Sequence, residues 1–74
     1  MSNEIKYEVI EKIGVISGVD KKWQKELNLI SWNGREPKYD IRDWDSSHEK
    51  MGKGVTFTRD ELKRLRDILI DLEL

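Results

Sequence analysis

The sequence contains no cysteine, so neither a disulfide bond nor a thiolate metal site can stabilise the chain. No apolar run approaches the ~20 residues that are needed to span a bilayer. The N-terminal stretch MSNEIKYEVIEK has no basic segment followed by an apolar one, so it does not match a secretory signal. These absences fit a reducing compartment, and we expect a cytoplasmic protein with no membrane partner.

Length and composition allow only a small core. The chain has 74 residues, which allows one domain, predicted over 1–74. Isoleucine, leucine, valine and phenylalanine make up 20 of the 74 residues, a larger share than the ~20% that is typical of disorder. Charged residues reach 39%, so the margin of stability is small. Because association of two copies is a common solution for such a chain, we expect a homodimer.

The net charge of −1 argues against a generic polyanion binder, but the charges are unevenly distributed. Residues 21–57 hold eight lysines and arginines against six acidic residues, whereas both flanking segments are acidic. All three tryptophans, Trp23, Trp32 and Trp44, lie in this basic middle segment. Cations combined with aromatics are typical of surfaces that bind single-stranded nucleic acid.

The order of apolar and turn residues predicts an α+β fold. β-branched and aromatic alternation indicates strands over 5–16, 23–33, 38–44 and 55–57, with a bulge near Gly14 and a polar loop over 45–54. Thr58 and Glu61 then match a capping box, and leucines follow at helical spacing. Consecutive strands followed by one helix predict a four-stranded antiparallel meander with a C-terminal helix, ββββα. A single helix covers one sheet face, which leaves the other open to solvent or to a ligand.

The third predicted strand has two distinct faces. Tyr39 and Ile41 are the inward candidates, and the outward residues are then Lys38, Asp40, Arg42 and Trp44. Arg42 beside Trp44 supplies a phosphate contact and a stacking surface, and stacking is worth roughly 1–3 kcal/mol per base. The alternative is an ordinary solvated face with cross-strand ion pairs, which the position of Asp40 between two cations favours.

Further basic and aromatic residues extend this candidate surface. Trp23 and Lys25 repeat the pattern on the second strand, although periodicity does not assign the inward face of 23–33. Lys50 and Lys53 lie in the following loop, where glycines flank Lys53 and allow close approach to a phosphate. The spacing of a P-loop is absent, and a flexible hairpin loop is the simpler interpretation.

Acidic residues in the same loop suggest a metal site only weakly. Asp43, Asp45, His48 and Glu49 have suitable ligand atoms, but they do not follow a calcium-loop pattern. His48 is the only histidine, and no serine nucleophile motif accompanies it. A metal-dependent nuclease using Asp43, Asp45 and His48 is therefore the weakest hypothesis. We expect no enzymatic activity, no cofactor and no metal.

The segment PKYDIRDW, followed by a polar loop, KMGKGVTFT and an amphipathic helix, resembles a known family. It is similar to the bacterial YdbC-like proteins, which belong with the single-stranded-DNA-binding domain of the transcriptional coactivator positive cofactor four. The resemblance covers residues 5–72. It implies a homodimer of ββββα protomers whose strands present a basic, aromatic groove to single-stranded DNA, with little sequence preference.

The resemblance also implies roles for particular residues. Arg42 contacts phosphate, Trp44 stacks on a base, and Lys53 and Lys50 supply basic contacts. In the turn after the second strand, SWNGRE has only Arg35 as a basic residue where the family has several, which places more of the binding on the second strand.

On family parity, Lys25, Leu29 and Ser31 face the DNA, whereas Ile30 and Trp32 face inward. The predicted nucleic-acid-binding residues are therefore Trp23, Lys25, Lys38, Arg42, Trp44, Lys50 and Lys53.

The predicted function is binding of single-stranded DNA, or of single-stranded RNA, since stacking and phosphate contacts accept both. A role in transcription or in DNA replication and repair follows, with transcription or replication proteins as further partners and a position at the nucleoid. The alternative is a protein-interaction module that binds a transcription-associated partner through the sheet face.

Overall fold

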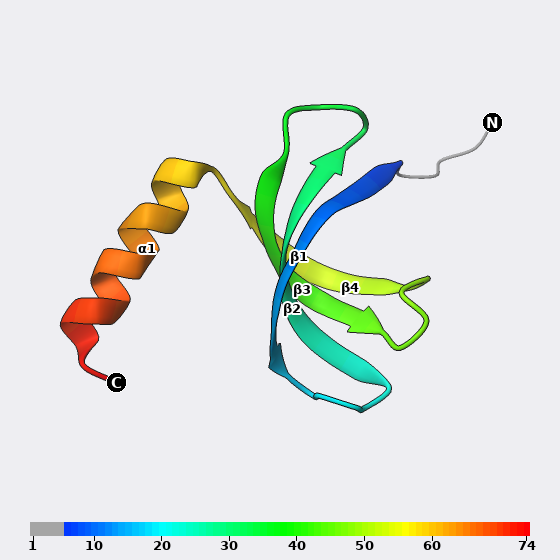
Figure 1. Ribbon diagram of the computed structural model, residues 1–74, viewed down its shortest axis with the longest axis horizontal. Helices are drawn as coiled ribbons and strands as arrows, with labels where there is room; N and C mark the ends of the chain where they lie inside the picture. The colour runs from blue at the N-terminus through cyan, green and yellow to red at the C-terminus, as the bar shows by residue number, and fades with distance from the viewer. Residues whose placement is uncertain (1–5) are drawn as a thin grey trace.

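The computed structural model describes residues 6–74, and these form one open antiparallel sheet followed by a helix (Figure 1). The elements are β1 (Tyr7–Ser17), β2 (Trp23–Trp32), β3 (Lys38–Asp45), β4 (Met51–Phe57) and α1 (Arg59–Leu72). The strands follow one another in space in chain order, as in a meander. This confirms the predicted α+β, ββββα architecture. The predicted start of the first strand, Ile5, lies outside the described residues.

Two of the strands depart from regular pairing. The register of β1 against β2 shifts three times, including once between Lys12 and Gly14, which confirms an irregularity near Gly14. β4 begins at Met51, four residues earlier than predicted, because Met51 pairs with Trp44 and Gly54 pairs with Arg42. The predicted loop over 45–54 is therefore too long, and Lys53 belongs to a strand.

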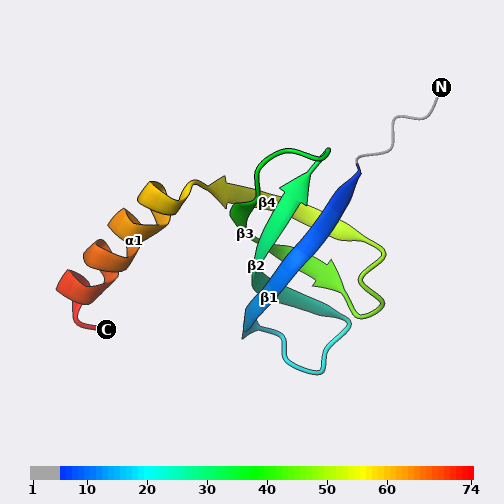
Figure 2. The same ribbon diagram turned by 45° about the horizontal axis from the view of Figure 1, so that its top comes forward.

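The helix begins at the predicted capping box. The Thr58 hydroxyl accepts a hydrogen bond from the Glu61 backbone N–H at 3.1 Å, and Glu61 Oε1 accepts one from the Thr58 N–H at 2.7 Å. The helix stands beside the sheet instead of lying across it, and none of its residues is buried (Figure 2). The expected covering of one sheet face by this helix is therefore incomplete. Among residues 6–74, no helix is long and apolar enough to cross a membrane.

Cross-strand pairing divides the sheet into two faces. Glu26 lies opposite Arg42, Leu27 opposite Ile41, and Asn28 opposite Asp40, and directly opposed residues share a face. We call one side the Arg42 face, with Glu26, Asn28, Ile30, Asp40, Arg42 and Trp44. We call the other the Ile41 face, with Leu27, Leu29, Tyr39, Ile41 and Val55.

The core lies on the Arg42 face, because the fully buried large side chains are Ile30, Asn28, Asp40 and Trp44. Tyr39 and Ile41 are only half-buried. The predicted alternation of β3 is right, but the predicted inward side is wrong.

Candidate nucleic-acid interface

Trp44 forms the centre of an aromatic cluster instead of lying exposed. Its indole is 0% exposed and stacks on the imidazole of His48, with ring centroids 4.0 Å apart and planes 6° apart. Tyr7 packs against it from β1 at 5.4 Å and also contacts Trp32 at 5.8 Å. The prediction of solvent exposure for Trp44 and Asp40 is therefore wrong, because β1 and the β3–β4 loop cover this face.

The loop after β3 folds back because Asp45 organises it. Its Oδ1 accepts hydrogen bonds from the backbone N–H groups of Glu49 and Lys50, both at 2.9 Å. Its Oδ2 accepts one from the Ser47 hydroxyl at 2.8 Å. The backbone hydrogen bond from Lys50 contributes most to lowering the pKa of Asp45 below its ordinary value. His48 has φ +61° in this tight loop, and its side chain lies over the sheet.

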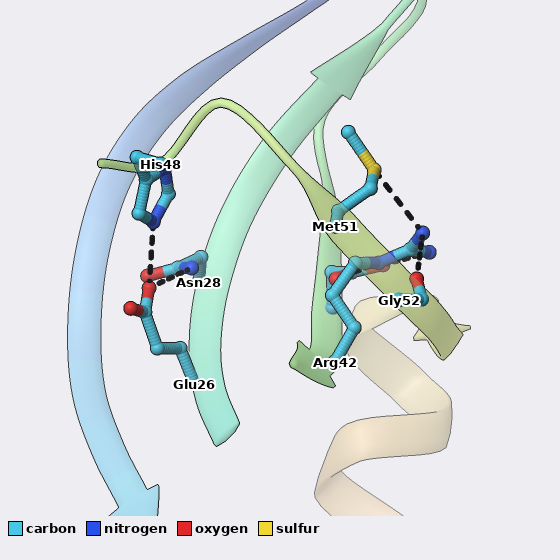
Figure 3. A network of polar contacts seen from close by, with 7 residues as sticks. Glu26, Asn28, Arg42, His48, Met51 and Gly52 are labelled. Atoms are coloured by element: carbon cyan, nitrogen blue, oxygen red, sulfur yellow. Dashed lines mark hydrogen bonds and ion pairs between the residues drawn. The ribbon is translucent and has the colours of Figure 1, made fainter. Parts of the chain in front are cut away.

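The buried carboxylate of Glu26 on β2 holds the His48 side chain in place (Figure 3). Glu26 Oε1 accepts a hydrogen bond from Asn28 Nδ2 at 3.0 Å and lies 2.9 Å from His48 Nε2. Burial of the Glu26 carboxyl raises its pKa, but the hydrogen bonds from Asn28 and His48 outweigh burial, so the pKa lies below its ordinary value. The Tyr7 hydroxyl adds a longer bond, at 3.3 Å, to the His48 carbonyl oxygen.

Arg42 is fixed by an internal ion pair. Its Nε and Nη2 each donate to one oxygen of the buried Asp40 carboxylate at 2.7 Å. Nη1 donates to the Gly52 carbonyl oxygen at 3.4 Å, and the guanidinium lies 4.7 Å from the Trp32 ring centroid. The guanidinium that was expected to bind phosphate is thus paired within the protein.

Gly54 makes room for this arginine. A Cβ at Gly54 would collide with the Arg42 Cβ, and it would lie 2.6 Å from the Ile41 carbonyl oxygen and 2.8 Å from Arg42 Nε. A Cβ at Gly52 would only touch Asp43, at 3.6 Å. The second glycine of GKG therefore serves the packing of Arg42, whereas sequence reasoning assigned it to close approach of a phosphate.

Trp32 is a candidate site residue that the sequence reasoning missed. It lies on the Arg42 face and lines an open hollow of about 330 Å³ with Arg35, Lys38, Arg42 and Thr56. Glu36 also lines this hollow, which therefore combines an aromatic wall with a rim of three cations and one carboxylate. The sequence shows that Trp32 and Glu26 point to the same side of β2. Only the pairing of Glu26 with Arg42 shows that this side belongs to the Arg42 face.

The other predicted site residues do not all share one face. Lys25 lies opposite Asp43 and Trp23 opposite Asp45, so the prediction that Lys25 and Trp23 share the face of Arg42 is wrong. Lys38, Lys50 and Lys53 are exposed. Lys38 lines the hollow, Lys50 precedes β4, and Lys53 lies within it. Whether any of these side chains binds nucleic acid stays a prediction.

Within residues 6–74, no three histidine, cysteine or acidic side chains are grouped to hold a metal ion. His48 is held by Glu26, and Asp45 is occupied by its own loop.

Comparisons with known proteins identify one family and one relative. The family described as "Transcriptional Coactivator p15 (PC4)" matches residues 19–68, which include β2, β3, β4 and most of the helix. An uncharacterized protein of Treponema pallidum (strain Nichols) is 47% identical over 74 residues. This alignment covers all of this chain and 87% of the relative.

Proposed function

We propose that this chain, which belongs to the family of Transcriptional Coactivator p15 (PC4), binds single-stranded DNA across the Arg42 face with little sequence preference. The family is one of nucleic-acid-binding, non-enzymatic proteins. The observation that carries the proposal is the juxtaposition of Trp32 and Arg42 with the exposed cations Arg35 and Lys38 around one open hollow. A stacking surface beside phosphate-binding cations is what a single strand requires.

The phosphates would be neutralised by the exposed cations of this surface, while Arg42 stays with Asp40. Arg35 and Lys38 line the hollow, and Lys50 precedes β4. Lys53 neighbours Gly54, which pairs with Arg42, so strand alternation turns Lys53 toward the Ile41 face. Three phosphate contacts, from Arg35, Lys38 and Lys50, predict a slope of log K against log salt of about −2, at about −0.7 per contact on a single strand. A supporting role in transcription or in DNA replication and repair, with a position at the nucleoid, follows from this activity.

The test is fluorescence anisotropy with labelled oligo-dT, repeated with a duplex of equal length and at several salt concentrations. We expect Lys38→Ala to weaken binding and to reduce the salt slope by about 0.7. Lys25→Ala is the matched control, because Lys25 is an exposed cation on the opposite face. Equal loss in both variants would contradict the assignment of the face. Equal binding to duplex, or none to any strand, would refute the function.

We also propose that two copies associate through the Ile41 face and the helix. A groove of about 680 Å³ lies between the sheet side chains Ile16, Leu27 and Ile41 and the helix leucines Leu62, Leu65 and Leu69. Isolated helices of this length are marginal in water, yet none of the helix residues is buried. Because each copy carries both a helix and an apolar face, a twofold pair would cover both.

Sedimentation tests the pairing. The wild type is expected at twice the 8.8 kDa of one chain, and Leu69→Glu is expected to shift it to the monomer. Arg64→Glu is the control, since Arg64 is an exposed residue of the same helix that does not line the groove. A monomeric wild type would refute this pairing.

A further inference from the structure

We propose that the position occupied by His48 is a nucleobase subsite in which a base stacks on Trp44 and donates hydrogen bonds to Glu26, with guanine preferred. This inference rests on the proposed binding of single strands and deepens it. It assigns one base-reading position within an otherwise sequence-tolerant surface.

The imidazole of His48 already makes the two contacts that readers of single-stranded bases use. It stacks on the Trp44 indole at 4.0 Å with nearly parallel planes, and its edge atom Nε2 lies 2.9 Å from the Glu26 carboxylate. Stacking on an aromatic ring combined with hydrogen bonding at the base edge is how unpaired bases are recognised. A planar base in the place of His48 would therefore meet the same ring and the same acceptor.

The carboxylate of Glu26 determines which base fits. An ionised carboxylate only accepts hydrogen bonds, so it requires donors on the base edge. Glu26 Oε1 contacts Asn28 and His48, and Oε2 makes no hydrogen bond with residues 6–74. Guanine presents two adjacent donors, N1–H and the N2 amino group, which match the two oxygens. Thymine presents one N–H between two carbonyl oxygens, and adenine and cytosine present an amino group beside a ring acceptor.

Open space lies beside the acceptor Glu26. A hollow of about 270 Å³ opens beside Glu26 and Asn28 and is also lined by Gln24, Lys12 and Gly14. Glu26 and Asn28 are themselves buried and held by each other. The acceptor is thus preorganised, which limits the entropy lost when a base binds.

Several features make His48 displaceable. Its backbone has φ +61°, a region that is uncommon for non-glycine residues, although histidine adopts it more often than most. The bond from Tyr7 to its carbonyl oxygen is long, at 3.3 Å. The buried indole Nε1–H of Trp44 has no hydrogen-bond partner among residues 6–74 while the loop is closed. This unpaired donor makes the packing around Trp44 less favourable than a fully hydrogen-bonded arrangement.

The first experiment uses the wild-type protein and labelled 12-mers of dT that contain one central dG, deoxyinosine, dA or dC. Anisotropy titrations should show about tenfold tighter binding of the dG oligomer than of dT alone, as expected for one bidentate base contact. Deoxyinosine lacks the N2 amino group and should lose most of this advantage. Equal affinity for all oligomers would overturn the inference, while dT binding that depends on Lys38 would leave the proposed function intact. Absence of binding to every oligomer would refute both.

The second experiment follows His48 itself by NMR, because it is the only histidine of the chain. Stacking on Trp44 should shift its ring protons upfield in the free protein. Saturation with the dG oligomer should remove that shift, whereas an abasic oligomer, which offers phosphates without bases, should leave it unchanged. Persistence of the upfield shift in the dG complex would exclude replacement of the imidazole by a base.

A substitution of Glu26 tests whether this carboxylate is the group that reads the base. Glu26→Gln should abolish the preference for dG over deoxyinosine while dT still binds, and Glu49→Gln is the control from the same neighbourhood. Circular dichroism establishes that both variants are folded. If a folded Glu26→Gln protein kept the dG preference, Glu26 would not be the reader.

Discussion

Replacing Gly54 by alanine tests whether this glycine exists to accommodate Arg42. The added Cβ would collide with the Arg42 Cβ and would lie 2.6 Å from the Ile41 carbonyl oxygen and 2.8 Å from Arg42 Nε, so β4 must separate from β3 or the guanidinium must shift on Asp40. Overpacking alone costs about 1–3 kcal/mol. Breaking a buried ion pair costs about 3–5 kcal/mol, because the remaining charge stays buried. We therefore expect a loss of about 3 kcal/mol in the free energy of unfolding, or a fall of more than about 12 °C in Tm.

Gly52→Ala is the matched control for this change. It lies two residues away in β4, and its Cβ would only contact Asp43 at the ordinary distance of 3.6 Å. Both variants should be unfolded in urea at one fixed protein concentration, followed by circular dichroism, because association makes stability concentration-dependent. If Gly54→Ala is as stable as Gly52→Ala, the packing argument is wrong, and Gly54 is required for something other than Arg42.

Three further predictions concern the helix cap, the buried carboxylate and the loop. Thr58→Ala should cost about 1 kcal/mol of unfolding free energy, with Ser46→Ala as a neutral comparison; an unchanged urea midpoint would show that the capping box is dispensable. The folded-state pKa of Glu26 lies below 4.5, so its contribution to stability is present above about pH 4.5 and is lost as pH falls through the folded-state value. Glu26→Gln should accordingly flatten the decrease of Tm below pH 4.5, and an unaltered pH profile would contradict this. Tyr7→Phe removes the hydrogen bond to the His48 carbonyl oxygen. The NMR chemical shifts of the His48 ring protons should then move toward the values of a solvent-exposed histidine. Unchanged chemical shifts would show that Tyr7 does not hold the loop.

Local sequence signals determined most of the fold. The capping box at Thr58 and Glu61 located the helix start, and alternation located three of the four strands. β4 was predicted too short because its first residues, MGKG, have neither β-branched nor aromatic side chains. Backbone pairing with β3 extends the strand there. The propensities of single residues do not include such pairing between strands.

The faces of the sheet were harder to predict than its strands. Alternation established that Arg42 and Trp44 share a side, but it does not say which side is buried. The usual assumption that apolar residues face the core selected Tyr39 and Ile41. The opposite side is buried because Tyr7 and His48, 37 and 4 residues away from Trp44, both pack on that ring. Tyr7 comes from β1, and the position of His48 depends on the loop that Asp45 organises.

The internal contacts on the Arg42 face determine which ligands can bind there. His48 is paired with Glu26 and stacked on Trp44, so a ligand that binds there must exchange these internal partners for its own. A polyanion without bases offers phosphates to the exposed lysines but nothing to replace the imidazole on Trp44. A single strand offers both, and a duplex keeps its base edges paired. If nucleic acid binds on this face, the internal pairs therefore reduce affinity for every ligand but reduce it least for unpaired bases. This gives selectivity without strong positive charge, as the net charge of −1 requires.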